Sequence, residues 1–150
     1  MQASLHHQVK RSAKVLPLYL IVSLFLLACG SKPTPEEEAA QAALSYYNRI
    51  LEGYPDGLLA AKAGCDSLPS DYREQLKETY QQYLRDIQRR HGGLTAIELS
   101  QNPPRRDSIR LQNGTCQHVV YASLLLSFND STREEITVPM IQQKGKWLLK

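Results

Sequence analysis

The sequence predicts an α+β fold, with helices in its first half and an antiparallel sheet in its second half. Apolar residues recur at helical spacing as far as residue 93, and from residue 94 onward apolar and polar residues alternate. Helices followed by a meander of strands favour a single sheet with the helices packed on one of its faces. About 120 residues follow the amino-terminal segment, which is the length of one ordinary domain.

The first helix is predicted by three agreeing signals at its start. Thr34 can cap the helix, Pro35 suits its first position, and Glu37 stands three residues after the cap. Helical spacing of apolar residues then continues up to Gly53.

Two more helices are expected before the sheet. Residues 58–63 predict a brief helix, and a loop follows at 65–69. The longest helix is expected to be capped by Ser70 or Asp71 and to end at Gly92. Its apolar face would consist of Leu76, Tyr80, Tyr83, Leu84 and Ile87.

Alternation predicts five strands, at residues 94–100, 109–111, 115–128, 134–142 and 146–150. Asn113-Gly114 is a strong hairpin signal between the second and third strands. Pro139 cannot donate to a strand ladder and therefore marks a sheet edge or a bulge. The longest strand should bury one face, made of Val120, Ala122, Leu124, Leu126 and Phe128, with Val119, Tyr121 and Ser123 on the other.

The amino-terminal segment has the layout of a signal peptide. Three bases and no acid precede an apolar run at residues 15–28, which is shorter than the roughly 20 residues of a membrane-spanning helix. Its end, Leu26-Leu27-Ala28-Cys29, resembles the lipobox of bacterial lipoproteins. The resemblance implies cleavage before Cys29, attachment of a diacylglycerol to its thiol, and a location in the bacterial cell envelope. An ordinary secreted protein with a cysteine near its cleavage site is the alternative.

We therefore expect a signal peptide at residues 1–28, a lipid-anchored tether at 29–35 and one α+β domain at 36–150. Five extended residues reach at most about 17 Å, so the domain would sit close to the membrane. Gly30 follows the cysteine, whereas an aspartate there retains many such lipoproteins in the inner membrane. The resemblance thus favours the outer membrane.

The charge of the expected mature chain argues against nucleic-acid binding. The whole sequence has 18 Lys and Arg against 15 Asp and Glu, and three of those bases, Lys10, Arg11 and Lys14, lie in the expected signal peptide. Acids and bases balance from Cys29 onward, and phosphate binding needs a surplus of bases on one face.

Two cysteines, Cys65 and Cys116, remain once Cys29 is assigned to lipid. An even number of thiols in an exported chain predicts a disulfide between them. The alternative is a reactive thiol paired with His91 or His118. The pattern offers no metal-binding spacing of cysteine and histidine, so neither a metal nor another cofactor is predicted.

Short motifs at two junctions resemble a known family. His91-Gly92-Gly93-Leu94 at the change from helix to strand and Lys144-Gly145-Lys146-Trp147 before the last strand are similar to a family of uncharacterised bacterial lipoproteins. Those proteins have a cystatin-like, nuclear-transport-factor-two-like domain. The resemblance implies a cone, in which a curved antiparallel sheet wraps around a long helix and sometimes encloses an apolar pocket. It implies no catalytic residues.

The sequence favours a binding function over catalysis, because no set of catalytic residues stands out. Tyr47, Tyr83, His118 and Tyr121 are the candidates for a pocket in the cone, since tyrosine has an apolar body and a polar tip. For the helical tyrosines Tyr47, Tyr80 and Tyr83, a place in the core with their hydroxyls at its rim is the preferred interpretation. We expect a non-enzymatic, membrane-anchored binding or protein-interaction module. The alternatives are a carrier of a small apolar ligand and an enzyme with His118 as acid or base.

Overall fold

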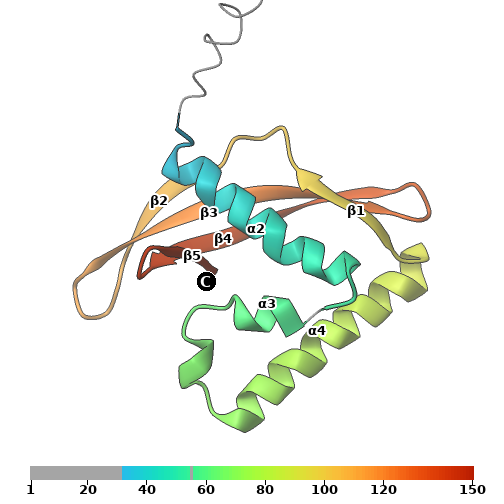
Figure 1. The fold of residues 1–150 in the computed structure, drawn as a ribbon, viewed down its shortest axis with the longest axis horizontal. Coiled ribbons are helices and arrows are strands. Elements are labelled where there is room, and N and C mark those ends of the chain that lie inside the picture. The colour runs from blue at the N-terminus through green and yellow to red at the C-terminus, as the bar shows by residue number, and fades with distance from the viewer. Residues whose placement is uncertain (1–31, 55) are drawn as a thin grey trace, which may run out of the picture. The chain divides into compact units, whose positions relative to one another are not determined.

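The computed structural model describes residues 32–54 and 56–150, and the part from Pro33 to Lys150 is one compact unit. The expected signal peptide, Cys29 and the first residues of the tether lie outside the described residues. The elements, drawn in Figure 1, are the helices α2 (Pro35–Leu51), α3 (Asp56–Ala60), η1 (Cys65–Ser67) and α4 (Ser70–His91), and the strands β1 (Leu94–Leu99), β2 (Arg105–Arg110), β3 (Cys116–Phe128), β4 (Arg133–Gln143) and β5 (Lys146–Leu149).

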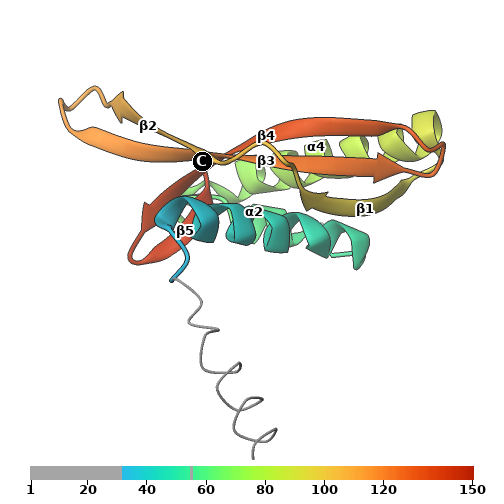
Figure 2. The same ribbon diagram turned by 90° about the horizontal axis from the view of Figure 1, so that it is seen from above.

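The predicted fold class is confirmed, because helices pack on one antiparallel five-stranded sheet. Figure 2 shows α2 running along one face of the sheet. The α3 helix lies next to α2, and α4 contacts α3 and β1. The last strands, β4 and β5, also contact α2.

The start of α2 follows the sequence signals closely. Glu37 N–H donates to the Thr34 hydroxyl (3.2 Å), and Thr34 N–H donates to the Glu37 carboxylate (2.7 Å). This reciprocal pair satisfies two backbone donors that a helix start leaves unpaired. Ala39, Ala40 and Ala43 form the buried face of α2. Their small side chains let the helix axis approach the sheet closely.

The α4 helix departs from the sequence prediction at its start. Its N-cap is Pro69, not Ser70 or Asp71, and no side chain caps it. The Ser70 hydroxyl donates instead to the Asp71 carboxylate (3.1 Å). The predicted end is correct, since Gly92 adopts a left-handed conformation (φ 71°) that favours glycine. Of the predicted apolar face, only Ile87 is fully buried.

Central strand β3 organises the sheet. It pairs with β4 along one side, and along the other side with β1 at its carboxyl-terminal half and with β2 at its amino-terminal half. The β2 strand is longer than the predicted 109–111. Its extra residues are Arg105, Arg106, Asp107 and Ser108, whose polar side chains give no alternation to detect.

The predicted inward face of β3 is confirmed. Its five residues Val120, Ala122, Leu124, Leu126 and Phe128 are buried and join the residues of α2 in one core. Val119 was expected on the other face and is nevertheless fully buried. It pairs with Ile141 on β4, which is also buried, so the opposite face carries a small apolar contact of its own.

The edge at β5 is closed by the chain itself. Ala63 N–H donates to the Leu149 carbonyl (2.7 Å), and Leu149 N–H donates to the Ala61 carbonyl (2.9 Å). These bonds use the backbone of residues 61–63 and explain why α3 ends at Ala60, short of the predicted 63. Pro139 lies where the pairing of β5 with β4 stops, as expected for a proline at an edge.

Burial on β3 predicts that two neighbouring leucines contribute very differently to the free energy of unfolding. Leu124 is 0% exposed in the core, whereas Leu125 points to the opposite face and is partly exposed. We expect Leu124→Ala to lower the free energy of unfolding by about 2 to 5 kcal/mol and Leu125→Ala by clearly less. Chemical denaturation measures both, and equal losses would contradict the assigned face.

Candidate functional site

The four residues predicted to line a pocket do not come together. Tyr47 on α2 and Tyr83 on α4 are neighbours, whereas His118 and Tyr121 lie on β3. His118 is exposed near the start of β3, and Tyr121 is on the face of β3 opposite the core. The twofold alternation of a strand explains the failure, because residues 118 and 121 differ by an odd number and must face opposite ways.

Tyr47, Tyr80 and Tyr83 form a cluster between α2 and α4, which we call the tyrosine cluster. Burial raises the pKa of Tyr47 to about 12, with further contributions from Tyr80 and Tyr83. Burial, and then the nearby Cys65, raises the pKa of Tyr80. The phenols therefore stay neutral at physiological pH and offer an apolar body with a hydroxyl.

The hydroxyls of the tyrosine cluster make no hydrogen bond within residues 32–54 and 56–150. The neighbouring Tyr46, by contrast, donates to the Trp147 carbonyl at 2.7 Å. Tyr83 is 39% exposed, so the cluster reaches the surface. Its chemistry is that of an amphipathic contact, with aromatic rings for packing and hydroxyls for polar partners.

His118 belongs to a two-stranded ribbon formed by β2 and the first half of β3, residues 105–121. The Ser108 hydroxyl and His118 Nδ1 lie 2.9 Å apart. On the other face of the ribbon, the Arg105 guanidinium stacks over the Tyr121 ring, 5.3 Å from its centre. Both contacts lie at the surface, so His118 lies outside the core between α2 and the sheet.

The carboxyl-terminal end of α4 is held by a network that the sequence reading missed. His91 lies with Nδ1 2.8 Å from the Asp130 carboxylate, and its ring stacks on Phe128 with the ring centres 4.5 Å apart. Bonds from the Thr132 hydroxyl and N–H, and then from His91, lower the pKa of Asp130 to about 2. The ionised carboxylate only accepts, so His91 Nδ1–H donates.

Histidine, aspartate and threonine together suggest a catalytic triad, but the bonds point to a structural role. The Thr132 hydroxyl donates to Asp130 (2.6 Å), so it is engaged with the carboxylate. Asp130 N–H also donates to the His91 carbonyl (3.1 Å), and Asn129 N–H to the Gly93 carbonyl (3.0 Å). The turn between β3 and β4 thereby fastens the end of α4.

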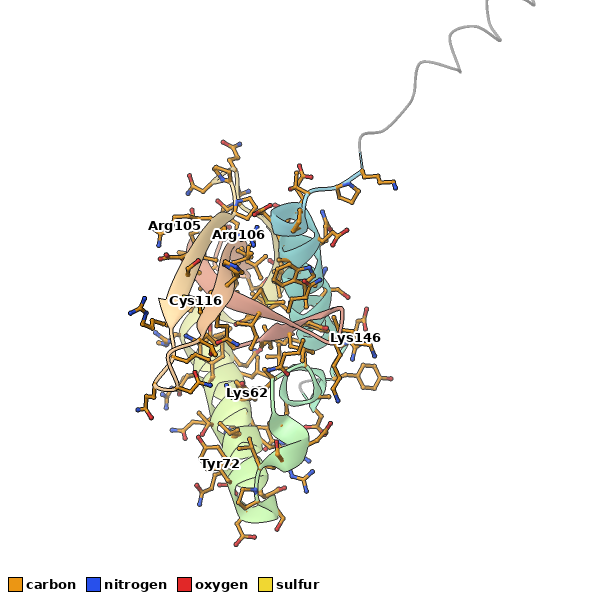
Figure 3. The ribbon with its side chains drawn as sticks, turned by 90° about the vertical axis from the view of Figure 1, so that its left-hand side faces the viewer. Lys62, Tyr72, Arg105, Arg106, Cys116 and Lys146 are labelled. Carbon is orange, nitrogen blue, oxygen red and sulfur yellow. The ribbon has the colours of Figure 1, made fainter. Side chains whose placement is uncertain are left out.

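The predicted disulfide between Cys65 and Cys116 is absent, because both are free thiols. Cys65 is buried in η1, near Tyr80 of α4. Cys116 is exposed on the ribbon, opposite Arg110, and Figure 3 shows it there. The even count of cysteines could not reveal that one thiol lies among the helices and the other on a projecting hairpin.

The structure also has a cavity of about 320 Å³ between α3 and the first turns of α4, lined by Asp56, Leu59, Ser70, Arg73, Glu74 and Lys77. Its charged groups partly neutralise each other, as Lys77 lies 3.4 Å from Asp56. It is an open hollow at the surface and includes none of the four residues predicted to line a pocket. Among the described residues, no group of three or more potential metal ligands gathers.

Comparisons with known proteins assign no family to this chain. The chain matches no protein-family model and no curated protein. A solved structure similar to it is a crystal structure of a proposed NTF2-like transpeptidase from Campylobacter jejuni, with 11% identity and a TM-score of 0.49. The match covers 71% of this chain and 92% of that one.

The Asp130 network predicts a specific acid dependence of stability. The folded pKa of about 2 lies below the ordinary 3.8, so Asp130 stabilises the fold above the ordinary value, and this contribution is lost as the pH falls toward 2. Asp130→Asn should therefore flatten the loss of stability between about pH 4 and pH 2. Thermal unfolding at several pH values measures it, and an unchanged pH dependence in Asp130→Asn would contradict the prediction.

Proposed function

We propose that the chain is a lipid-anchored, non-enzymatic interaction module of the bacterial cell envelope, attached through Cys29. The layout of residues 1–28 and the lipobox-like end support the anchor. The helix α2 begins at Pro35, so only a few residues separate Cys29 from the folded domain. Gly30 favours the outer membrane. Among residues 32–54 and 56–150, no helix is long and apolar enough to cross a bilayer.

Side chains fill the space between α2 and the inward face of the sheet, which favours a protein-interaction function over catalysis. Leu124, Met140 and Val120 on the inward face of the sheet are at most 1% exposed and pack with the alanines of α2. These positions would line a pocket in the cone, and side chains occupy the space between sheet and helix. The proposed acid or base of the enzyme alternative, His118, lies on the ribbon outside that space.

The tyrosine cluster is the surface that supports a binding role. Tyr83 of this cluster is 39% exposed, and large aromatic side chains at the surface are typical of interfaces. A small apolar ligand is the second candidate, since the aromatic rings of the cluster offer it an apolar surface.

The anchor predicts a clear effect of removing one thiol. Cys29→Ser should abolish incorporation of labelled fatty acid and leave an unprocessed precursor, because the diacylglycerol is attached to that sulfur. Cys116→Ser, which removes an exposed thiol in the domain, should be processed and labelled as the wild type is. Mass spectrometry of the mature chain checks the result, and an amino terminus other than Cys29 would rule out the anchor.

The interaction proposal predicts a position-dependent cross-link. A photoreactive amino acid in place of Tyr83 should yield a discrete protein adduct in cells, because that side chain borders the tyrosine cluster. The same group at Glu78, on the opposite and exposed side of α4, serves as the control and should yield none. An adduct of small mass at Tyr83 would favour the ligand carrier, and equal protein adducts at both positions would contradict a specific surface.

A further inference from the structure

The two edges of the sheet differ in whether another part of the described chain makes backbone bonds to them. The β5 edge is closed by backbone bonds from residues 61–63. The β2 strand pairs only with β3, through six regular residue pairs from Arg105 to Arg110. Its residues are all exposed except Ile109, which is partly buried. Within the described residues no further strand pairs with β1 or β2, which share one side of β3, and β2 is the more exposed of the two.

Backbone groups of alternate β2 residues point away from the sheet. Leu111 N–H donates to the Thr115 carbonyl (2.8 Å) at the end of the hairpin. In an antiparallel pair the bonded positions alternate, so Ile109, Asp107 and Arg105 also face β3. Arg106, Ser108 and Arg110 therefore direct their N–H and C=O groups outward.

The Ser108 N–H confirms this outward direction. This N–H donates to the carboxylate of Asp107 at 2.7 Å. The local bond occupies one outward donor. The N–H groups of Arg106 and Arg110, on either side of Ser108, remain for a strand that would pair with this edge.

The side chains on β2 give this edge a positive charge. Three of its six residues are arginines and one is an aspartate. Arg106 lies 3.6 Å from Glu36 at the first turn of α2, and Arg105 stacks on Tyr121. Figure 3 shows both arginines on the ribbon. Arg110 has no ion-pair partner among residues 32–54 and 56–150.

We propose that the outer edge of β2 binds an extended acidic segment of a protein partner, which adds to the sheet as a further strand. Main-chain bonds to Arg106 and Arg110 would fix the register, as in known strand additions. Acidic side chains next to Arg106 and Arg110 would supply specificity. This goes beyond the membrane anchor and does not depend on it.

The same charges disfavour a second copy of this chain as the occupant. Two β2 strands side by side would bring arginines close to arginines, and like charges on adjacent strands are destabilising. Basic residues on an open edge are a common protection against self-association. The β2 edge therefore disfavours pairing with a second β2 strand and favours a strand with acidic side chains.

A peptide titration with the full-length chain in detergent micelles tests the proposal. The probe is a fluorescent seven-residue peptide of alternating valine and glutamate, followed by anisotropy. One comparison peptide has lysine in place of glutamate, and another keeps the glutamates but is N-methylated at alternate backbone nitrogens. We expect binding of the acidic peptide only, with the lysine and N-methylated peptides weaker by at least about tenfold.

Two protein variants distinguish binding at the β2 edge from nonspecific electrostatic attraction. Arg110→Glu should weaken binding by about tenfold or more, whereas Arg85→Glu on α4 makes the same change of net charge and should leave it unaltered. Hydrogen exchange should show new protection of the Arg106 and Arg110 amides on peptide addition, and little change at Asp107 and Ile109. Equal affinity for the N-methylated peptide, equal effects of the two variants, or no new protection would overturn the proposal.

Discussion

The contact between the inward face of β3 and the small face of α2 is the constraint on which the rest of the structure depends. The β3 strand has 13 residues and pairs with three other strands, so every strand except β5 takes its position directly from it. Ala39, Ala40 and Ala43 bring α2 close enough for Leu124 and Leu126 to lose all contact with water. Larger residues at these alanines would separate the layers and open the core.

The sequence could predict the fold because its strongest signals are local. The capping box at Thr34 and Glu37, the left-handed Gly92 and the alternation along β3 each depend on neighbours in the chain, and the structure bears out each of them. The polar strand β2 was mostly missed because its register comes from pairing with β3, a contact that composition does not encode.

The His91–Asp130 contact and the tyrosine cluster were harder to predict, because each joins segments that are distant in the sequence. His91 and Asp130 are 39 residues apart and meet only because the turn between β3 and β4 returns to the end of α4. The tyrosine cluster likewise joins Tyr47 on α2 with two residues of α4. Residue type suggested tyrosines correctly as amphipathic groups, but assigning Tyr121 and His118 to the same pocket ignored the alternation of β3 and was wrong.

The open β2 edge has a physical reason in the same topology. The strands β1 and β2 share one side of β3, and within residues 32–54 and 56–150 no further strand pairs with that side. Residues 61–63 cover the opposite edge between α3 and α4. An uncovered strand must be protected or used. The arginines of β2 disfavour pairing with a like-charged edge. The outward N–H groups of Arg106 and Arg110 can still bond to a strand of opposite charge.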